Sequence, residues 1–294
     1  MGNKKELHNW SSELSESSID FTQPDIMLKL IATVDSRGWP HLTIITSNRA
    51  IAKDQVVWGR FTDGLSKKHV LDNPKQGIIY MTGDMPFRIL QLKIDFTHTK
   101  KDGPDIEYFN QSNLMRYMTY MNVYKAYYNK VVAASSVRKL SLGGIAMGII
   151  KAMMAKGAAK TKLGEKRLNP VGYKIFKGPI NPKFIAYIDP SDGYPIIIPC
   201  VQLTAADHNR FVFSPSVLKN DLGNIPIGCI TAVLGMTFSL ANQLAKGTFI
   251  GFKKFRGIKL GVIEIEEIYN SSPPLPGKIY PEIFHRPKVT DFHL

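Results

Sequence analysis

Cysteine is scarce in this 294-residue chain: Cys200 and Cys229 are the only two, and neither belongs to a C-x-x-C pair. So small a number argues against a disulfide framework and against a zinc site built on cysteine. The seven histidines are scattered without metal-ligand spacing, so no metal site is expected. The N-terminal residues lack the apolar core of a signal peptide, and we therefore expect a reducing, cytoplasmic location.

Familiar catalytic patterns are also missing. The sequence shows no Ser/His/Asp set, no paired-carboxylate site and no G-x-G-x-x-G loop, so the catalytic residues stay unassigned. His69 and His208 are expected to be surface or helix residues rather than catalysts, and Trp39 and Trp58 to pack in a core or a turn. With 44% hydrophobic and 21% charged residues, the chain nevertheless has the composition of a folded globular protein.

Acidic residues are nearly absent from the middle of the chain. Between Asn113 and Pro182 there are thirteen Lys and Arg but one acid, Glu165, and this segment carries most of the formal net charge of +14. Residues 113–167 lack proline and space their apolar residues by three and four, which predicts one or two helices. Two interpretations stay open: a basic amphipathic linker that packs on its neighbours, or a contact with nucleic acid or an anionic membrane through residues 113–167.

The sequence is rich in β-strand patterns. From Ile26, and again from Lys183, apolar and β-branched runs of strand length alternate with turn residues. Residues 31–45, IATVDSRGWPHLTII, match residues 185–199, IAYIDPSDGYPIIIP, in the Ile-Ala start, the aspartate and the Gly-aromatic-Pro turn. Each half continues with a second apolar strand and a short segment that closes on N-P or N-I-P. A repeat of this length predicts a duplicated domain.

A cluster of hydroxyl and ammonium groups follows the second apolar strand of the first half. The stretch FTDGLSKK, residues 61–68, closes that strand and precedes a helix-like segment that reaches Asn73-Pro74. Hydroxyls, ammonium groups and the free N–H groups of a helix start are the donors that a phosphate monoester requires. The alternative interpretation is a solvated turn, since charge runs usually face water.

With strand, motif and helix in this order, the first half resembles the FMN-binding split-barrel family of pyridoxamine 5'-phosphate oxidases and flavin reductase-like proteins. The matching residues are Phe61, Thr62, Ser66, Lys67 and Lys68, with L-x-N-P at 71–74 and D-x-x-G-x-P-H at 35–41. The resemblance covers residues 25–100 well, residues 183–270 more faintly, and the basic segment not at all.

This resemblance implies a fold that is mainly β with α. It predicts two tandem split β-barrels, antiparallel and of Greek-key type, joined by a basic helical linker. The expected domains are an N-terminal tail or helix (1–24), an N-terminal split barrel (25–112), the basic helical linker (113–182), and a C-terminal split barrel with its tail (183–294). Most relatives pair as homodimers with FMN between two barrels, so the two halves are expected to form an internal pseudo-dimer.

The resemblance also implies a set of cofactor-binding residues. They are Thr43, Thr46, Ser47, Phe61, Thr62, Ser66, Lys67 and Lys68. The hydroxyls and lysines of the motif would hold the phosphate, and the strand from residue 41 to 47 would approach the flavin ring. Relatives often carry Arg where this strand has Thr43, which puts one phosphate contact in doubt. FMN is expected, and FAD or a deazaflavin stays open because the motif contacts only the shared phosphate end.

The implied function is a flavin-dependent oxidoreductase that transfers hydride or electrons to or from a small organic substrate. NAD(P)H is a candidate donor and a homodimer a candidate assembly. The alternative is a non-catalytic flavin-binding or degenerate split-barrel protein whose basic linker binds nucleic acid or an anionic membrane surface.

The second half of the repeat departs from the phosphate motif. Its aligned run, residues 213–220, places Leu218 where the first half has Ser66, and Asn220 where it has Lys68. Loss of two charge-assisted or hydroxyl contacts weakens phosphate binding by roughly a hundredfold. We therefore expect one flavin per chain, held by the first half.

Overall fold

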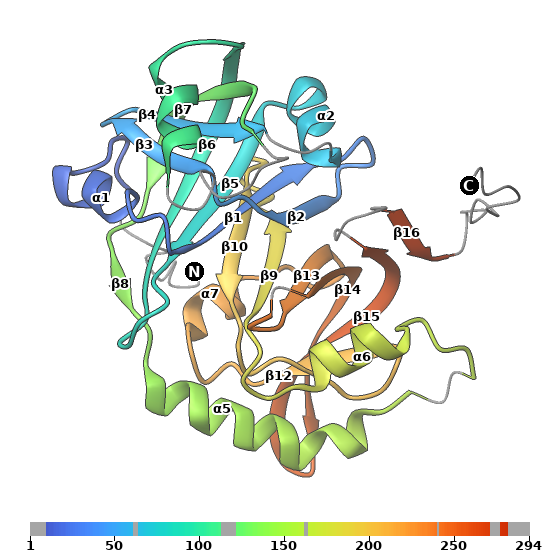
Figure 1. Ribbon diagram of the computed structural model, residues 1–294. Helices are drawn as coiled ribbons and strands as arrows, with labels where there is room; N and C mark the ends of the chain where they lie inside the picture. Colours follow the sequence, from blue (N-terminus) through green and yellow to red (C-terminus); the bar gives the residue numbers. More distant parts are fainter. Residues whose placement is uncertain are drawn as a thin grey trace, which may run out of the picture.

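The computed structural model describes residues 10–60, 64–112, 122–161, 164–239, 241–270 and 277–281. In these ranges the chain forms two eight-stranded antiparallel sheets with short helices around them (Figure 1). The expected fold class, mainly β with α, is confirmed.

The elements of the two halves follow in the same sequence along the chain. The first half contains α1 (Glu16–Phe21), β1 (Leu28–Val34), β2 (Pro40–Ile44), β3 (Asn48–Ala52), β4 (Gln55–Arg60), α2 (Leu65–Asp72), β5 (Lys75–Met81), β6 (Arg88–Lys100), α3 (Pro104–Gln111), β7 (Lys125–Ala134) and β8 (Arg138–Lys139). The connection and second half contain α5 (Leu142–Ala155), the 3-10 helix η1 (Lys156–Ala159), α6 (Pro170–Lys177), β9 (Lys183–Ile188), β10 (Pro195–Pro199), β11 (Thr204–Ala205), β12 (Arg210–Phe213), α7 (Lys219–Gly223), β13 (Ile230–Met236), β14 (Asn242–Phe255), β15 (Ile258–Asn270) and β16 (Gly277–Tyr280).

Strand order is identical in the two sheets. The first sheet runs β2-β1-β5-β6-β7-β4-β3 and the second runs β10-β9-β13-β14-β15-β12-β11. Outside these paths, β8 pairs with β6 and β16 pairs with β15. The outermost strands of each path are consecutive in the chain: residues 45–47 join β2 to β3, and residues 200–203 join β10 to β11. Connections this short bring both ends of a sheet together, so each sheet curls into a barrel. We call them the N-terminal barrel (β1–β8) and the C-terminal barrel (β9–β16).

Facing strands of the two barrels are buried on both sides. In β1, Ile31 points into the N-terminal barrel, whereas Leu30 on its other face joins the apolar cluster between the barrels. In β9, Ile185 points into the C-terminal barrel and Phe184 joins the same shared cluster. Burial of both faces explains why these strands are continuously apolar instead of alternating.

Contacts between the barrels are reciprocal. Strand β5 packs on β10, where Gly77 lies against the backbone of Pro195, and the equivalent strand β13 packs on β2. Strand β1 contacts β10, just as β9 contacts β2. Contacts of this kind are those of an isologous dimer interface, here within one chain.

A buried lysine ties the first strand of each barrel to the helix before it. The Lys29 Nζ donates to the carbonyl oxygens of Thr22, at 2.8 Å, and Asn48, at 2.7 Å. The Lys183 Nζ likewise donates to the carbonyl oxygen of Gly178, at 2.7 Å. Thr22 and Gly178 are the C-caps of α1 and α6, where a cation also faces the negative end of the helix. Burial lowers the pKa of each lysine to about 8.

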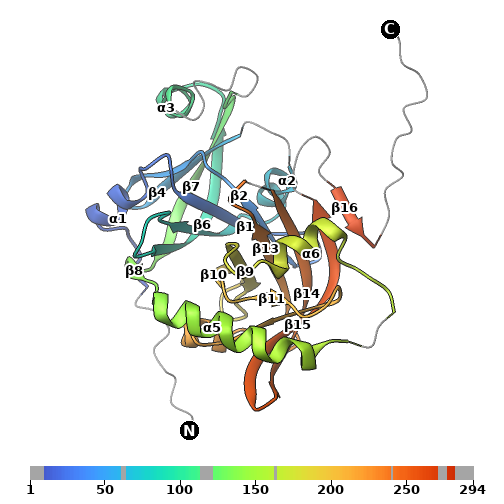
Figure 2. The same cartoon turned by 60° about the horizontal axis from the view of Figure 1, so that its bottom comes forward.

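The expectation of a basic helical linker over residues 113–182 is wrong in part. Lys125–Ala134 forms β7, which lies between β6 and β4 in the N-terminal barrel, and Arg138–Lys139 forms β8. Tyr127 and Val131 pack in the barrel core. The apolar pattern of this short segment fits either a helix or a strand, and its pairing with neighbouring strands determined that it forms a strand. The described helices that connect the barrels are α5, η1 and α6 (Figure 2).

Candidate functional site

The phosphate motif falls at the start of α2, on the N-terminal barrel. Ser66 is buried, with 4% of its surface exposed, Lys67 is half-buried and Lys68 is exposed. Phe61 and Thr62 lie outside the described residues.

One buried polar group at this turn lacks a partner among the described residues, and the helix start has no side-chain cap. Gly64 is the N-cap of α2 and provides no side-chain acceptor for the first backbone N–H groups. The Ser66 Oγ makes no hydrogen bond to any residue that the structure describes. A buried hydroxyl without a partner costs free energy, which a bound acceptor would offset.

Two buried histidines lie close together here, His69 on α2 itself and His41 on β2. His69 is one turn after Ser66 and its Nδ1 is 3.0 Å from the Thr33 Oγ1. Its ring meets the ring of His41 edge-on at 5.1 Å, and His41 in turn meets Tyr269 of the C-terminal barrel at 5.3 Å. The His41 Nδ1 is also unpartnered among the described residues.

Both histidines are neutral near pH 7. Burial, reinforced by the charge of Lys246, holds the pKa of His41 well below its usual value and also lowers the pKa of His69. Each neutral ring has one donor and one acceptor nitrogen, so this region contains uncharged groups that can either donate or accept a hydrogen bond.

Charged side chains from the C-terminal barrel close in on this region. The Lys246 Nζ, on β14, contacts the Asp35 carboxylate at 2.8 Å, and Arg37 contacts Glu267 at 3.0 Å. Burial alone would raise the pKa of Asp35. Hydrogen bonds from Lys246 and the Trp39 N–H outweigh this effect and hold the pKa of Asp35 far below its usual range, so the carboxylate stays ionised. The β1–β2 turn is therefore fixed to the opposite barrel.

The same ion pair occurs at the other end of the interface. Lys93 on β6 contacts Asp189 at 3.1 Å, and Asp189 occupies the place in the β9–β10 turn that Asp35 occupies in the β1–β2 turn. Strand register makes Lys93 and Lys246 equivalent, because they lie opposite Gly77 in β5 and Ala232 in β13. The two pairs thus relate the barrels by an internal two-fold arrangement.

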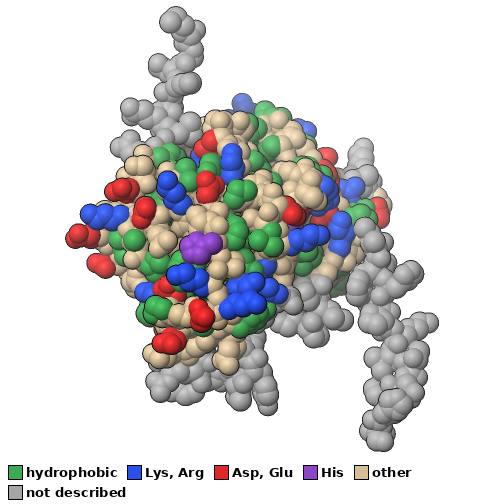
Figure 3. All heavy atoms as spheres, turned by 90° about the horizontal axis from the view of Figure 1, so that it is seen from above, with side chains coloured by type: hydrophobic (Ala, Val, Ile, Leu, Met, Phe, Trp, Pro, Cys, Tyr) green, Lys and Arg blue, Asp and Glu red, His purple; other side chains and the backbone are tan. Residues whose placement is uncertain are grey.

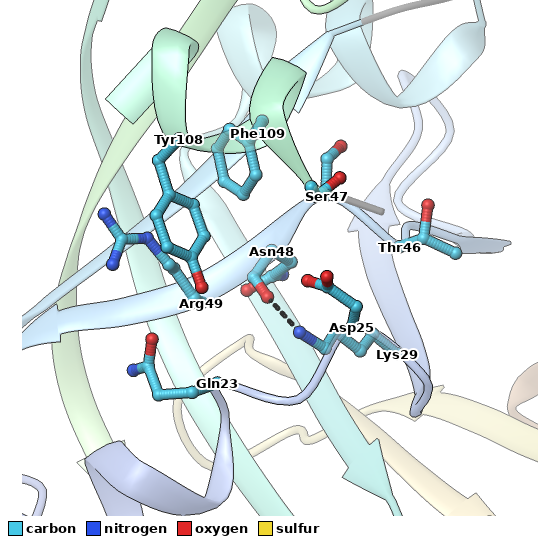
Figure 4. Close-up of a pocket in the computed structure, with 10 residues that line it drawn as sticks. Gln23, Asp25, Lys29, Thr46, Ser47, Asn48, Arg49, Tyr108 and Phe109 are labelled. Carbon is cyan, nitrogen blue, oxygen red and sulfur yellow. Dashed lines mark hydrogen bonds between the residues drawn. The ribbon is translucent and has the colours of Figure 1, made fainter. Parts of the chain in front are cut away.

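The three ring-contact residues expected from the sequence are divided between two places. Thr43 lies in β2, paired with Ile31 of β1. Thr46 and Ser47 line a cavity of about 20 Å³ in the N-terminal barrel (Figure 4), which has room for a water-sized group and none for a flavin ring. The Ser47 Oγ donates to the carbonyl oxygen of Gly59 at 2.9 Å, so this hydroxyl ties β3 to β4.

The matching helix start in the C-terminal barrel carries a buried acid. Helix α7 begins after Leu218, its N-cap, and carries Asp221 in its first turn. The Asp221 carboxylate is buried and pairs with Arg138 at 3.2 Å. The gapless pairing of Leu218 with Ser66 is wrong, because matching the two N-caps shifts the alignment by two residues and places Asp221 opposite Lys67.

Helix α5 covers the second position. Gly144 lies against the side chain of Val217 and Gly148 against that of Gln202, where any larger residue would push into these side chains. Ile145 joins Val217 and Leu218 in the apolar cluster between the barrels. The chain itself therefore fills the place that corresponds to the Ser66 turn.

Sequence patterns missed most of the partners around α2. His69 is a helix residue as expected, but it is buried rather than at the surface. Trp58 is in the core, stacked on Tyr127 with ring centroids 3.9 Å apart. The repeated aspartate at residues 35 and 189 was a usable signal, but its lysine partners are far away in the chain and could not be identified from spacing.

Comparison with known proteins identifies structural neighbours. No family model and no curated protein matches the chain. Similar solved structures include an FMN-binding protein from Syntrophomonas wolfei subsp. wolfei, 12% identical with a TM-score of 0.32, over 39% of this chain and 77% of that one. An F420 reductase is 15% identical with a TM-score of 0.32, over 42% and 98% of the two chains. General Stress Protein 26 from Bacillus anthracis str. Sterne is 12% identical with a TM-score of 0.30, over 42% and 94%.

Proposed function

We propose that the chain is a tandem duplication of a flavin-binding split barrel and that it holds one flavin, expected to be FMN, at the start of α2. The observation that carries this proposal is the buried Ser66 Oγ, which lacks a partner among the described residues and lies between a side-chain-free N-cap and two lysines. A phosphate monoester supplies the acceptors that this turn lacks.

Duplication is supported by features that recur at equivalent positions. They are the identical strand order, the buried lysines Lys29 and Lys183, and the reciprocal pairs Asp35–Lys246 and Lys93–Asp189. A single-chain pseudo-dimer would have two equivalent grooves at the ends of its interface. One of them is filled by α5 and carries Asp221, so a single flavin per chain is the expected stoichiometry.

The residues present fit the phosphate end of a flavin better than they fit a metal ion, because ammonium groups and backbone N–H groups donate to anions. Ser66 provides a hydroxyl, Lys67 and Lys68 provide charge, and the first turn of α2 provides backbone donors. A bound flavin would supply reversible hydride or electron transfer. The chain would orient it, and neutral His41 and His69 would provide buried hydrogen-bonding groups close to this helix start.

On this basis we infer an oxidoreductase that acts on a small organic substrate, with NAD(P)H as candidate donor. Flavin binding is tested by measuring the mass and molar ratio of the cofactor released from denatured native protein, and by adding FMN to stripped protein. Turnover is tested separately, by following NAD(P)H oxidation with the reconstituted protein. One flavin per chain supports the proposal, whereas two flavins, or no uptake of FMN at millimolar concentration, would contradict it.

A further inference from the structure

Helix α5 turns an apolar face to solvent. Its exposed residues are Leu142, Gly143, Ala146, Met147, Ile150, Met153 and Met154, and Gly157 and Ala158 continue the same face into η1. Their spacing of three and four residues places them on one side of the helix. A surface helix of a water-exposed protein normally presents polar residues on this side, so the pattern of α5 is inverted.

The other side of α5 is packed on the C-terminal barrel. Ile145, Gly148, Ala152 and Ala155 are buried, and Gly148 lies against the side chain of Gln202. Residues Leu142–Ala159 are long and apolar enough to cross a membrane by length and composition. Insertion across a bilayer would separate this packed face from the barrel, whereas binding parallel to a surface leaves it intact.

Basic residues surround the exposed apolar face. On the α5 side they are Lys139, Lys151, Lys156 and Lys160, and on the tip of the β14–β15 hairpin they are Lys253, Lys254, Arg256 and Lys259. The sequence has no acid from residue 113 to 164 or from residue 245 to 263. The surface that these residues form with the exposed side of α5 is called the α5 face below.

The hairpin tip and α5 belong to one surface. The Arg256 Nη1 donates to the carbonyl oxygen of Met154 at 3.4 Å, and Phe255 packs on the apolar cluster that contains Ala155. Figures 1 and 2 both show the hairpin projecting beside α5, on the side of the molecule away from the N-terminal barrel. The opposite side, seen in Figure 3, intersperses acidic and basic side chains. In contrast, the charged residues that define the α5 face are all basic.

We propose that the α5 face docks on an anionic phospholipid membrane, with α5 parallel to the surface. Its apolar residues would enter the boundary between headgroups and acyl chains, and its lysines and Arg256 would contact lipid phosphates. Membrane binding would use both features of the α5 face: the apolar residues of α5 provide hydrophobic contact, and the basic residues around them provide charge complementarity.

Other occupants explain less of this face. Nucleic acid would pair with the basic residues, but it would leave Met147, Ile150 and Met154 in water. A second copy of the chain would cover the apolar residues, but it would bring the same positive charges together across the interface. An anionic bilayer is the partner that accommodates both.

The test is flotation of the purified full chain with vesicles of phosphatidylcholine alone and of equimolar phosphatidylcholine and phosphatidylglycerol. We expect binding to the anionic vesicles and loss of binding at high salt. Lys253→Ala with Lys254→Ala should lower the partition coefficient by about thirtyfold. The matched control, Lys100→Ala with Lys101→Ala on the N-terminal barrel, should leave it unchanged, although the loss of net charge is the same.

A second variant pair tests the apolar contribution. Ile150→Ser should weaken vesicle binding by about tenfold, whereas Ile26→Ser, at an exposed isoleucine on the N-terminal barrel, should have no effect. Equal thermal unfolding of each variant and the native protein verifies that the fold is retained. Failure of the native protein to float with anionic vesicles would overturn the proposal. So would salt-sensitive DNA binding without vesicle binding, or a dimer that Ile150→Ser dissociates.

Discussion

At the start of α2 the N-terminal barrel presents Ser66, whose Oγ has no partner among the described residues, beside two lysines. The matching turn of the C-terminal barrel presents Asp221, which pairs with Arg138. The strands around these two turns have the same order and the same contacts across the interface. The comparison shows that residues which hold the barrels together recur in both halves, while residues at the helix starts differ in charge. Interface and site are therefore separable features of one fold.

Removal of the motif lysines should have the largest effect. Lys67→Ala with Lys68→Ala removes two charges from the α2 turn, and we expect flavin affinity to fall by at least about a hundredfold. Lys219→Ala, at the start of α7, should leave affinity nearly unchanged. Titration of stripped protein with FMN, followed by flavin fluorescence, measures both. Equal losses in the two variants would contradict the assignment of the site to the N-terminal barrel.

The two interface aspartates should differ in their effect on stability. Asp35→Asn leaves the deeply buried Lys246 without its carboxylate partner, and we expect a loss of about 3 kcal/mol in the free energy of unfolding. Asp189→Asn should cost about 1 kcal/mol, because Asp189 is more exposed and Lys93 keeps a second partner in Asp192. Urea unfolding of each variant measures the difference, and a larger cost for Asp189→Asn would be the contrary result.

The buried lysines predict a matching pH dependence in the two barrels. Lys29 and Lys183 each have a pKa near 8 in the folded chain, below the usual value of 10.5. Between these values the unfolded chain binds more protons, so the free energy of unfolding should rise with pH. Relative to Lys29→Met, the native protein should gain up to about 3 kcal/mol between about pH 8 and pH 10.

The same series with Lys183→Met serves as the counterpart from the other barrel. Urea unfolding at several pH values provides the measurement for both variants. Two equal slopes would support equivalent roles, and a stability difference that does not change with pH would show that these amines keep an ordinary pKa.

Two turn glycines should give the smallest effects. Gly38 and Gly193 have φ values of +76° and +77°, which a side chain disfavours. Gly38→Ala and Gly193→Ala should each cost about 1 kcal/mol, and by similar amounts, because they hold the same position in equivalent turns. Thermal unfolding detects this, and a neutral result at one position would show that the two turns differ in strain.

Prediction from sequence succeeded where the signal is local. Alternating and continuous apolar runs indicated β1, β2, β9 and β10, and the Gly-aromatic-Pro turns matched the positive φ values of Gly38 and Gly193. Prediction failed for β7, whose position depends on pairing with β6 and β4. It also missed the equivalence of α1 and α6, which becomes visible once Lys29 and Lys183 are seen to bind their C-caps.

The sequence predicted part of the candidate site and missed the rest. Order and spacing located Ser66, Lys67 and Lys68 at a helix start, and the structure places a helix there. The buried His41 and His69, and the Lys246 pair with Asp35, were not predicted, because their partners come from different strands and from the opposite barrel.

The sequence by itself determined the strand pattern, the repeated aspartate turn, the concentration of positive charge and the cluster of Ser66, Lys67 and Lys68, because each depends on residues close together in the chain. Only the tertiary structure decided that Asp221 and α5 lie at the C-terminal counterpart of the α2 turn, and that the apolar face of α5 points outward. Burial and partner choice depend on residues brought together from distant segments, and sequence spacing does not record which side of a helix the rest of the chain will cover.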